Sequence, residues 1–339
     1  MRLGILTGGG DCPGLNAAIR ALVRHGEDRG ITVIGFRDGW RGVLDGHAYE
    51  LTLEAVRGIL PRGGTILGTS GTQPHLIDGG PDLVRDGMAV HGLDGFVVIG
   101  GEGTMGTTAA MPDVAAVGIP KTIDNDIEGT DASIGFWTAP QVATDSVDRL
   151  YSTAESHNRV MVCEVMGRSA GWIGLTAGIA GGADIILIPE YPFDIEAVCR
   201  RIRRVHSERR PFSIVVVSEG AAPIPDTMTV PEYSLDENGW PRLGGIGSLV
   251  AEEIHRRIRS ETRVTTLGHV QRGGSPVAFD RVLASRLGMA AVDEAIAGRW
   301  GYLVGLRGGD IVTTPLAEAG ARPRLVPGEL QRIPEILCT

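Results

Sequence analysis

The segment Pro120-Lys121-Thr122-Ile123-Asp124-Asn125-Asp126 decides which fold this sequence predicts. It follows the apolar run 113–119, whose length and composition predict a buried strand. A threonine, two aspartates and an asparagine therefore come directly after the carboxyl end of a strand. In open α/β sheets, ligands bind at that end of the strands. The segment thus predicts an α/β sheet with a binding site beside residues 120–126.

The same arrangement occurs at two earlier points of the chain. The apolar run 96–99 precedes Gly100-Gly101-Glu102-Gly103-Thr104, and the run 3–7 precedes Gly8-Gly9-Gly10-Asp11-Cys12-Pro13-Gly14. Glycine turns at helix N-termini bind phosphate, and carboxylates bind divalent cations. Together the strand ends predict a site for phosphate and a divalent metal.

The first glycine run is less specific when taken alone. It lacks the Lys-Ser/Thr pair of a P-loop, and Pro13 replaces the third glycine of the dinucleotide fingerprint. A nicotinamide dehydrogenase is therefore a remote alternative. By itself, this run indicates only a tight turn.

Composition limits the class of protein. The chain has 339 residues, of which 42% are hydrophobic, and this length predicts two domains. The net charge of −9 argues against nucleic acid as a partner, because proteins that bind it usually carry the opposite charge. An anionic substrate would need individual arginines to overcome this charge.

The cysteines and the hydropathy pattern indicate the compartment. Cys12, Cys163, Cys199 and Cys338 form no C-x-x-C pair, so neither a zinc site nor a disulfide framework is indicated, and reduced thiols are expected. The N-terminus has no signal-peptide pattern, and no apolar run approaches the roughly 18 residues that cross a bilayer. We expect a soluble, cytoplasmic protein without a membrane partner.

Strand and helix patterns alternate along the chain, which predicts mostly parallel sheets covered by helices on both faces. The predicted strands are 3–7, 31–36, 96–99, 113–119, 159–165, 184–188, 212–218, 262–269 and a final strand 302–306. The predicted helices are 15–26, 53–60, 83–91, 130–157, 172–179, 194–209, 248–258 and 279–297. A turn is expected at 271–276, and the Pro- and Gly-rich segment 221–245 is expected to be a surface insertion.

Phosphoryl transfer to a sugar hydroxyl would give these polar residues distinct roles. Such a reaction needs positioning, a metal and cations around the moving group. Asp124 is a candidate base, Glu102 and Asp126 are candidates for holding Mg²⁺, and Thr122 and Gly10 could donate hydrogen bonds. Each carboxylate alone could instead be a strand-end cap or a surface residue, which is the usual role of Asp.

The second half of the chain supplies candidates for binding an anionic substrate. Arginine stays charged and binds phosphate bidentately. The arginines near predicted strand ends are Arg159, Arg168, Arg263 and Arg272. Glu219 and His269 occupy similar places and could bind sugar hydroxyls or a phosphate, although a lone histidine is more often structural.

These motifs together resemble those of the 6-phosphofructokinases over nearly the whole chain. The resemblance rests on the segments 9–17, 100–104 and 120–126, on Glu164-Val165-Met166-Gly167-Arg168, and on Leu267-Gly268-His269-Val270-Gln271-Arg272-Gly273-Gly274. Five ordered motifs are far more specific than one glycine loop. The resemblance implies a glycolytic kinase that transfers a phosphoryl group to the 1-hydroxyl of fructose 6-phosphate.

The resemblance also implies a fold and an assembly. It implies two three-layer α/β domains with the active site between them. The donor-binding domain would comprise residues 1–135 and about 271–320, and the sugar-phosphate domain residues 136–270 and about 321–339. It further implies a homotetramer, with a dimer as the alternative, in which Arg159 and Arg263 reach the sugar 6-phosphate of a neighbouring subunit.

Residue roles follow from the same resemblance. It implies that Asp124 is the base, that Thr122 and Arg168 stabilise the transferring group, and that Glu102 and Asp126 organise Mg²⁺. Lys121 joins this catalytic group as a possible source of positive charge. The residues implied to contact the sugar phosphate are Thr122, Asp124, Arg159, Met166, Gly167, Arg168, Glu219, Arg263, His269 and Arg272. The residues implied to line the donor pocket are Gly10, Gly101, Glu102, Gly103 and Thr104.

Two positions leave the identity of the donor open between ATP and pyrophosphate. Gly103 matches the ATP-using members of the family, whereas Lys121 matches the pyrophosphate-using members. Steric exclusion is severe in a packed pocket and an extra charge is tolerable, so we expect ATP as the co-substrate.

Another departure from the family concerns activity. Gly71 stands where the family usually has an arginine beside the donor phosphate, and such a loss would weaken stabilisation of the transition state. A paralogue acting on another sugar phosphate and a non-catalytic sensor therefore remain alternatives. Effectors are also left open, because Arg210 matches the basic effector site of bacterial relatives and Tyr151 does not.

Overall fold

A computed structural model describes residues 1–208, 210–230, 243–330 and 333. Cys338, Arg209 and residues 231–242 of the expected insertion lie outside this description. The chain forms two compact units. The first comprises Met1–Thr138 with Arg272–Arg324, and the second comprises Ala139–Gln271 with Leu325–Thr339. The α/β class and the mostly parallel sheets are confirmed.

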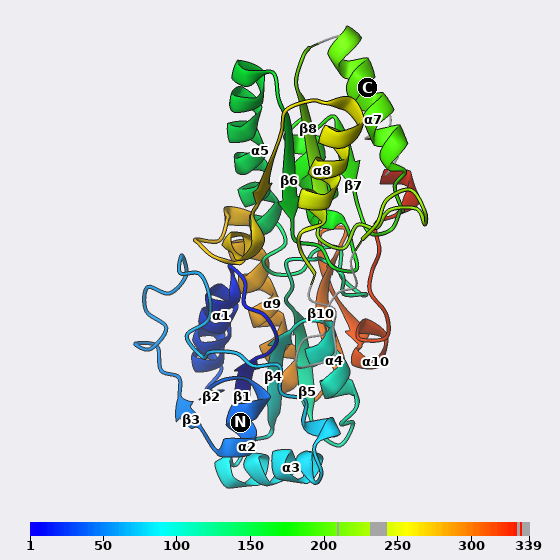
Figure 1. Ribbon diagram of the computed structural model, residues 1–339. Coiled ribbons are helices and arrows are strands. Elements are labelled where there is room, and N and C mark those ends of the chain that lie inside the picture. The colour runs from blue at the N-terminus through cyan, green and yellow to red at the C-terminus, as the bar shows by residue number, and fades with distance from the viewer. Residues whose placement is uncertain (209, 231–242, 331–332, 334–339) are drawn as a thin grey trace. The chain divides into compact units, whose positions relative to one another are not determined.

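The first unit contains a seven-stranded sheet of order β11-β10-β5-β4-β1-β2-β3 (Figure 1). Its strands are β1 (Arg2–Thr7), β2 (Thr32–Phe36), β3 (Ala48–Glu50), β4 (Gly95–Gly100), β5 (Ala116–Pro120), β10 (Tyr302–Arg307) and β11 (Asp310–Pro315). The pairs from β2 to β10 are parallel, and β3 and β11 form antiparallel edges. In the sheet, β1 lies between β2 on one side and β4 on the other, so the order of the strands reverses at β1. The carboxyl ends of β1 and β4 therefore flank a switch point, where α/β sheets bind ligands.

Helices cover both faces of this sheet. On one face α1 (Leu15–Asp28) packs against α9 (Ala278–Ile296) (Figure 1). Gly288 permits this approach, because a Cβ there would lie 2.7 Å from the carbonyl oxygen of Ala18. The other face carries α2 (Trp40–Asp45), η1 (Pro74–Leu76), α3 (Gly80–His91), α4 (Glu102–Ala109) and α10 (Leu316–Ala319).

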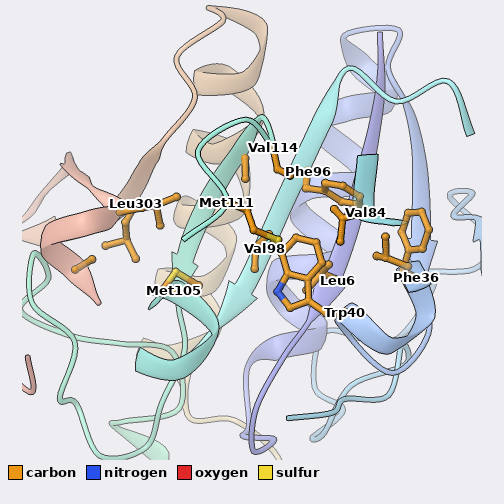
Figure 2. Close-up of a cluster of buried hydrophobic side chains, with 14 of the residues drawn as sticks. Leu6, Phe36, Trp40, Val84, Phe96, Val98, Met105, Met111, Val114 and Leu303 are labelled. Carbon is orange, nitrogen blue, oxygen red and sulfur yellow. The ribbon is translucent and has the colours of Figure 1, made fainter. Parts of the chain in front are cut away.

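A hydrophobic core fills the space beneath α2, α3 and α4 (Figure 2). The rings of Phe36 and Trp40 both meet Phe96 edge-on, at centroid distances of 5.6 and 5.4 Å. Such contacts stabilise a core beyond simple area burial. The core therefore fixes β1 and β4, whose ends carry the glycine turns.

The second unit contains a parallel four-stranded sheet of order β7-β8-β6-β9. Its strands are β6 (Val160–Val165), β7 (Ile185–Leu187), β8 (Ser213–Ser218) and β9 (Thr262–Thr266). Its helices are α5 (Thr138–His157), α6 (Trp172–Ala180), α7 (Ile195–Glu208), α8 (Ile246–Ile258) and the 3₁₀ helix η2 (Gly268–Arg272). The helices α7 and α8 close a core over one face, with Val162, Val215 and Ile254 among its buried residues (Figure 1).

Among the residues described, one predicted helix is absent, and another begins later in the chain than predicted. Residues 53–60 form turns, and Gly58 adopts a left-handed φ of 75° that a helix does not accommodate. Val56 and Ile59 are nevertheless buried. The predicted helix 130–157 begins only at Thr138, and Pro140 lies in its first turn, where proline is tolerated. The residues before Thr138 form a loop that braces the segment 121–126.

Strand boundaries also differ from the predictions. The strand predicted at 113–119 begins at Ala116, and 302–306 is not the final strand, because β11 follows as a hairpin partner. The strand predicted at 262–269 ends at Thr266, after which Gly268 (φ 49°) begins η2. The turn predicted at 271–276 therefore starts inside a 3₁₀ helix. None of the helices in the described ranges is long and apolar enough to cross a membrane.

Candidate active site

Two helix N-termini lie at the switch point of the first unit. The helix α1 begins after the glycine turn that follows β1, and α4 begins directly after β4. Within the described residues, no side-chain hydrogen bond caps either helix. The free N–H groups and the helix dipole make such a terminus attractive to an anion.

Two other helices, α5 and α8, have N–H groups of their first turns bonded to buried carboxylates. Asp280 accepts the N–H of Thr138 at the start of α5, at 2.8 Å. Glu164 accepts the N–H groups of Gly245 and Gly247 at the start of α8, at 3.0 and 2.7 Å. In the described ranges, the starts of α1 and α4 have no such carboxylate, and both lie at the switch point, so they suit phosphate.

The loop 65–72 is fastened to the first glycine turn. The N–H of Gly9 donates to the carbonyl of Ser70 at 2.9 Å, and the Thr69 hydroxyl donates to the carbonyl of Gly9 at 2.5 Å. Gly71, one residue further, has no atom within 4 Å of a Cβ built on it. The loop thus adds hydroxyls beside the turn, and its position 71 has room for a larger side chain.

Lys121 lies beneath the same turn. It is 3% exposed, and its ammonium donates to the carbonyl of Gly10. Burial lowers the pKa of Lys121, an effect that the nearby Arg272 increases and Asp11 opposes. A negative charge placed beside this buried ammonium would therefore stabilise its charged form.

The segment that carries the two aspartates is tightly braced. Asn125 adopts a left-handed φ of 53°, which asparagine tolerates. Its side chain accepts the N–H of Ser133 at 2.9 Å, and the Ser133 hydroxyl donates to the carbonyl of Thr122 at 2.6 Å. The Thr122 hydroxyl accepts the N–H of Asp124 at 3.1 Å. These bonds hold Thr122 and Asp124 in one fixed turn.

Arg324 braces this turn from the end of the first unit. Its guanidinium donates to the carbonyl oxygens of Asn125 and Asp131 at 3.2 and 3.3 Å, and its N–H donates to the carbonyl of Asp126 at 2.8 Å. Burial lowers its pKa. Sequence reasoning missed Arg324, and no local pattern could have found it, because its partners are almost 200 residues away.

Glu102 and Asp126 form the candidate metal site. Burial raises the pKa of Glu102, and the negative charge of Asp126 raises it further. Burial also raises the pKa of Asp126, while its backbone and Thr122 hydrogen bonds act in the opposite direction. Two neighbouring carboxylates with raised pKa values favour a cation between them.

The chemistry of these two carboxylates fits Mg²⁺. In the described part of the chain, no group of three His, Cys, Asp or Glu side chains could hold a metal. Mg²⁺ usually binds one or two carboxylates together with substrate phosphates and waters, so it does not need a third protein ligand. The residues present therefore fit Mg²⁺ on a phosphate substrate.

Arg272 lies against the first glycine turn, in the first unit. Its Nη1 donates to the carbonyl of Asp11 at 3.2 Å and would be 2.7 Å from a Cβ at Gly10. Gly10 thus leaves room for the guanidinium. Cys12, beside it, is no nucleophile, because burial raises its pKa to about 12.

The predicted sugar-phosphate residues of the second unit fall into two groups. One group lies at the carboxyl ends of the strands and comprises Met166, Gly167, Arg168, Glu219 and His269. The N–H of Glu219 donates to the carbonyl of Val165 at 2.8 Å, which ties the ends of β8 and β6 together. Such a cluster can surround one small polar ligand.

Arg159 and Arg263 form the other group, at the amino ends of β6 and β9. Their guanidinium groups share one carboxylate, with distances of 2.8 Å from Arg159 and 2.6 Å from Arg263 to Glu261. The hydrogen bond from Arg159 lowers the pKa of Glu261. The structure therefore brings these two arginines together but places them away from Met166 and His269.

Arg210, a candidate effector contact, is already engaged. Its guanidinium lies over the rings of Tyr151 and Phe212, at 4.8 and 4.3 Å, and pairs with Asp184 at 2.8 Å. Its charge is therefore partly neutralised within the second unit.

This fold and these residues define an α/β protein whose candidate site suits a phosphate and a divalent metal. The sequence matches the family described as "PFK: Phosphofructokinase" over residues 2–295. A pyrophosphate–fructose 6-phosphate 1-phosphotransferase of Streptomyces coelicolor is 53% identical over 96% of both chains. An ATP-dependent 6-phosphofructokinase of Mycobacterium leprae is 50% identical over 96% of both.

Solved structures have a similar fold. Phosphofructokinase of Pichia pastoris in the T-state matches with a TM-score of 0.84 and 34% identity, over 94% of this chain and 35% of that one. A pyrophosphate-dependent phosphofructokinase of Marinobacter aquaeolei matches with a TM-score of 0.84 and 21% identity. The match covers 100% of this chain and 91% of the Marinobacter chain. The chain belongs to the phosphofructokinase family, as its motifs predicted.

Proposed function

We propose that this protein transfers a phosphoryl group from ATP to the 1-hydroxyl of fructose 6-phosphate, with Mg²⁺, as a step of glycolysis. One observation carries the proposal: Lys121, Thr122, Asp124 and Asp126 follow β5 beside two uncapped helix N-termini. Cations, hydroxyls and carboxylates around a phosphate site are what phosphoryl transfer needs. The names of the S. coelicolor and M. leprae relatives support phosphofructokinase activity.

In this proposal the first unit binds the donor. Gly10, Gly101, Glu102, Gly103 and Thr104 line the donor pocket at the starts of α1 and α4. Glu102 and Asp126 would hold Mg²⁺, which when bound would supply positive charge to the donor phosphates. Asp124 accepts the proton of the attacking hydroxyl, and its braced turn keeps the carboxylate in position.

The second unit binds the sugar phosphate. Met166, Gly167, Glu219 and His269 contact the sugar, and Arg168 joins Thr122 in stabilising the transferring phosphoryl group. Arg272, in the first unit, adds positive charge for the sugar phosphate. Arg159 and Arg263 bind the 6-phosphate of a neighbouring subunit in a homotetramer. The homotetramer and the cytoplasmic location both stay predictions.

The choice of ATP rests on Gly103. This residue is exposed, and no atom lies within 4 Å of a Cβ built there, which supports a donor that extends past this position. Pyrophosphate is the second candidate, favoured by the buried ammonium of Lys121. Relatives of similar identity carry both names.

Initial rates with fructose 6-phosphate and Mg²⁺ test the proposal, with ATP and pyrophosphate compared on one preparation. Turnover with ATP supports it, and turnover with pyrophosphate alone would transfer the donor role to the second candidate. Turnover with neither would contradict it and favour another acceptor or a sensor. Asp124→Asn should fold normally and lose most turnover, and near-normal turnover would exclude Asp124 as the base.

A further inference from the structure

The side chain of Gln271 joins two strand ends of the second unit. It is completely buried, at 0% exposure. Its Oε1 accepts the N–H of Met166 at 3.3 Å, and its Nε2 donates to the carbonyl of Gly268 at 3.0 Å. A backbone N–H can only donate and a carbonyl can only accept, so these partners fix the orientation of the amide.

This amide replaces the next hydrogen bond of the β6–β9 ladder. The pairing ends at Glu164 and Thr266, followed by a bond of 3.0 Å from Leu267 N–H to the carbonyl of Glu164. A regular parallel ladder would continue from Met166 N–H to the carbonyl of Leu267. The chain instead turns at Gly268 into η2, and the carbonyl of Leu267 accepts the N–H of Val270 at 3.4 Å.

Gln271 is therefore the acceptor that keeps Met166 in place. Met166 is 9% exposed, and a buried N–H without a partner is costly. The other end of the same amide holds Gly268, which directly precedes His269. One rigid side chain thus sets the spacing between the end of β6 and the start of η2.

We infer that Gln271 is a positioning residue for the sugar phosphate, because it fixes Met166 and His269 relative to each other. This inference rests on the proposed function, which gives those two residues a role in sugar-phosphate binding. Gln271 itself is buried and does not touch the ligand in this account. The inference predicts that changing its side chain affects the sugar phosphate and leaves the donor unaffected.

The chemistry of the amide defines the test variants. Gln271→Met keeps the length of the side chain but loses both the donor and the acceptor. Gln271→Asn keeps the amide but is one methylene shorter, so it cannot reach both partners. Gln141→Met is the matched control, because Gln141 is exposed on α5 and bonds to Asp145 at 2.7 Å.

The experiment measures kcat and both KM values for the wild type and the three variants, with folding checked by circular dichroism. We expect the KM for fructose 6-phosphate to rise about tenfold in both Gln271 variants, because binding must then restore the spacing that this buried hydrogen bond sets. The KM for the donor should stay within about twofold, and Gln141→Met should match the wild type. If Gln271→Met does not fold, Gln271→Asn decides the question.

Two results would overturn the inference. An unchanged KM for fructose 6-phosphate in a folded Gln271 variant would exclude the positioning role. Equal rises in both KM values would show a general structural role instead. If the wild type turns over fructose 6-phosphate with neither donor, the proposed function fails separately. Calorimetric binding of fructose 6-phosphate then judges Gln271, and no binding to the wild type would end both proposals.

Discussion

The open space at Gly103 allows the donor to be tested by adding a side chain. Gly103 lies in the first turn of α4, and no atom lies within 4 Å of its Cβ position. Gly103→Asn should therefore fold without strain. Replacing a helical glycine gains a few tenths of a kcal/mol. Any loss of activity in this variant would then come from the donor pocket and not from unfolding.

The expected magnitude follows from overlap between the new side chain and the nucleotide. Forcing extra atoms into a filled site costs about 1–3 kcal/mol. Each 1.4 kcal/mol is a factor of ten, so kcat/KM with ATP should fall by roughly 10–100-fold. Pyrophosphate is shorter than ATP and should end before this space, so its kcat/KM should change by less than about threefold. The steric change should thus reverse or weaken any preference for ATP.

Gly103→Asp separates shape from charge. A carboxylate about 6 Å from a donor phosphate costs about 3 kcal/mol per unit charge at an effective dielectric constant near 20. Because both donors carry charged phosphates, both should lose more in the Asp variant than in the Asn variant. Lys121, whose ammonium lies 4.0 Å from the Cβ position of Gly101, should offset part of this cost. Initial rates with both donors and a thermal melt are the assays. Equal losses with both donors in folded Gly103→Asn would refute the steric reasoning.

Three further predictions concern charges near the switch point. Lys121→Gly should lower kcat/KM with pyrophosphate far more than with ATP, because it removes a buried cation; equal losses in steady-state rates would remove that assignment. The half-saturating Mg²⁺ concentration should rise as pH falls toward the raised pKa values of Glu102 and Asp126, because protons then compete with the metal for the carboxylates. Titrations of rate against Mg²⁺ that coincide at every pH would contradict this. Arg324→Met should lower kcat at least tenfold with little change in either KM, because the turn carrying Asp124 loses its brace; an unchanged kcat would show that the turn is held without Arg324.

The sequence predicted the parts of the site that depend on local pattern. Residues 96–104 and 113–126 combine an apolar run with a polar strand end, and both were found at the carboxyl ends of neighbouring strands. The helix predicted for the described segment 53–60 is absent. Its apolar residues are buried, but successive turns around Gly58 carry them. Apolar spacing alone cannot separate these two ways of burying a side chain.

The supporting residues could not be predicted because their partners are distant in the sequence. Gln271 bonds to Met166 across 105 positions, and Asp280 bonds to Thr138 across 142. Each of these side chains accepts a hydrogen bond from a backbone N–H group that becomes buried only when the chain folds. Local motifs therefore predicted the candidate ligand residues, whereas the residues that hold them in place depend on contacts that form only in the folded chain.

The order of the strands also has a consequence for synthesis on the ribosome. The strand β10 lies next to β5 in the first sheet, although the whole second sheet is encoded between them. The second sheet is contiguous in the chain, so all of its strands emerge before β10 does. We expect the first sheet to start early and finish last, with the edge of β5 exposed in the meantime. A nascent chain that stalls before residue 302 would present that edge to chaperones or to other chains.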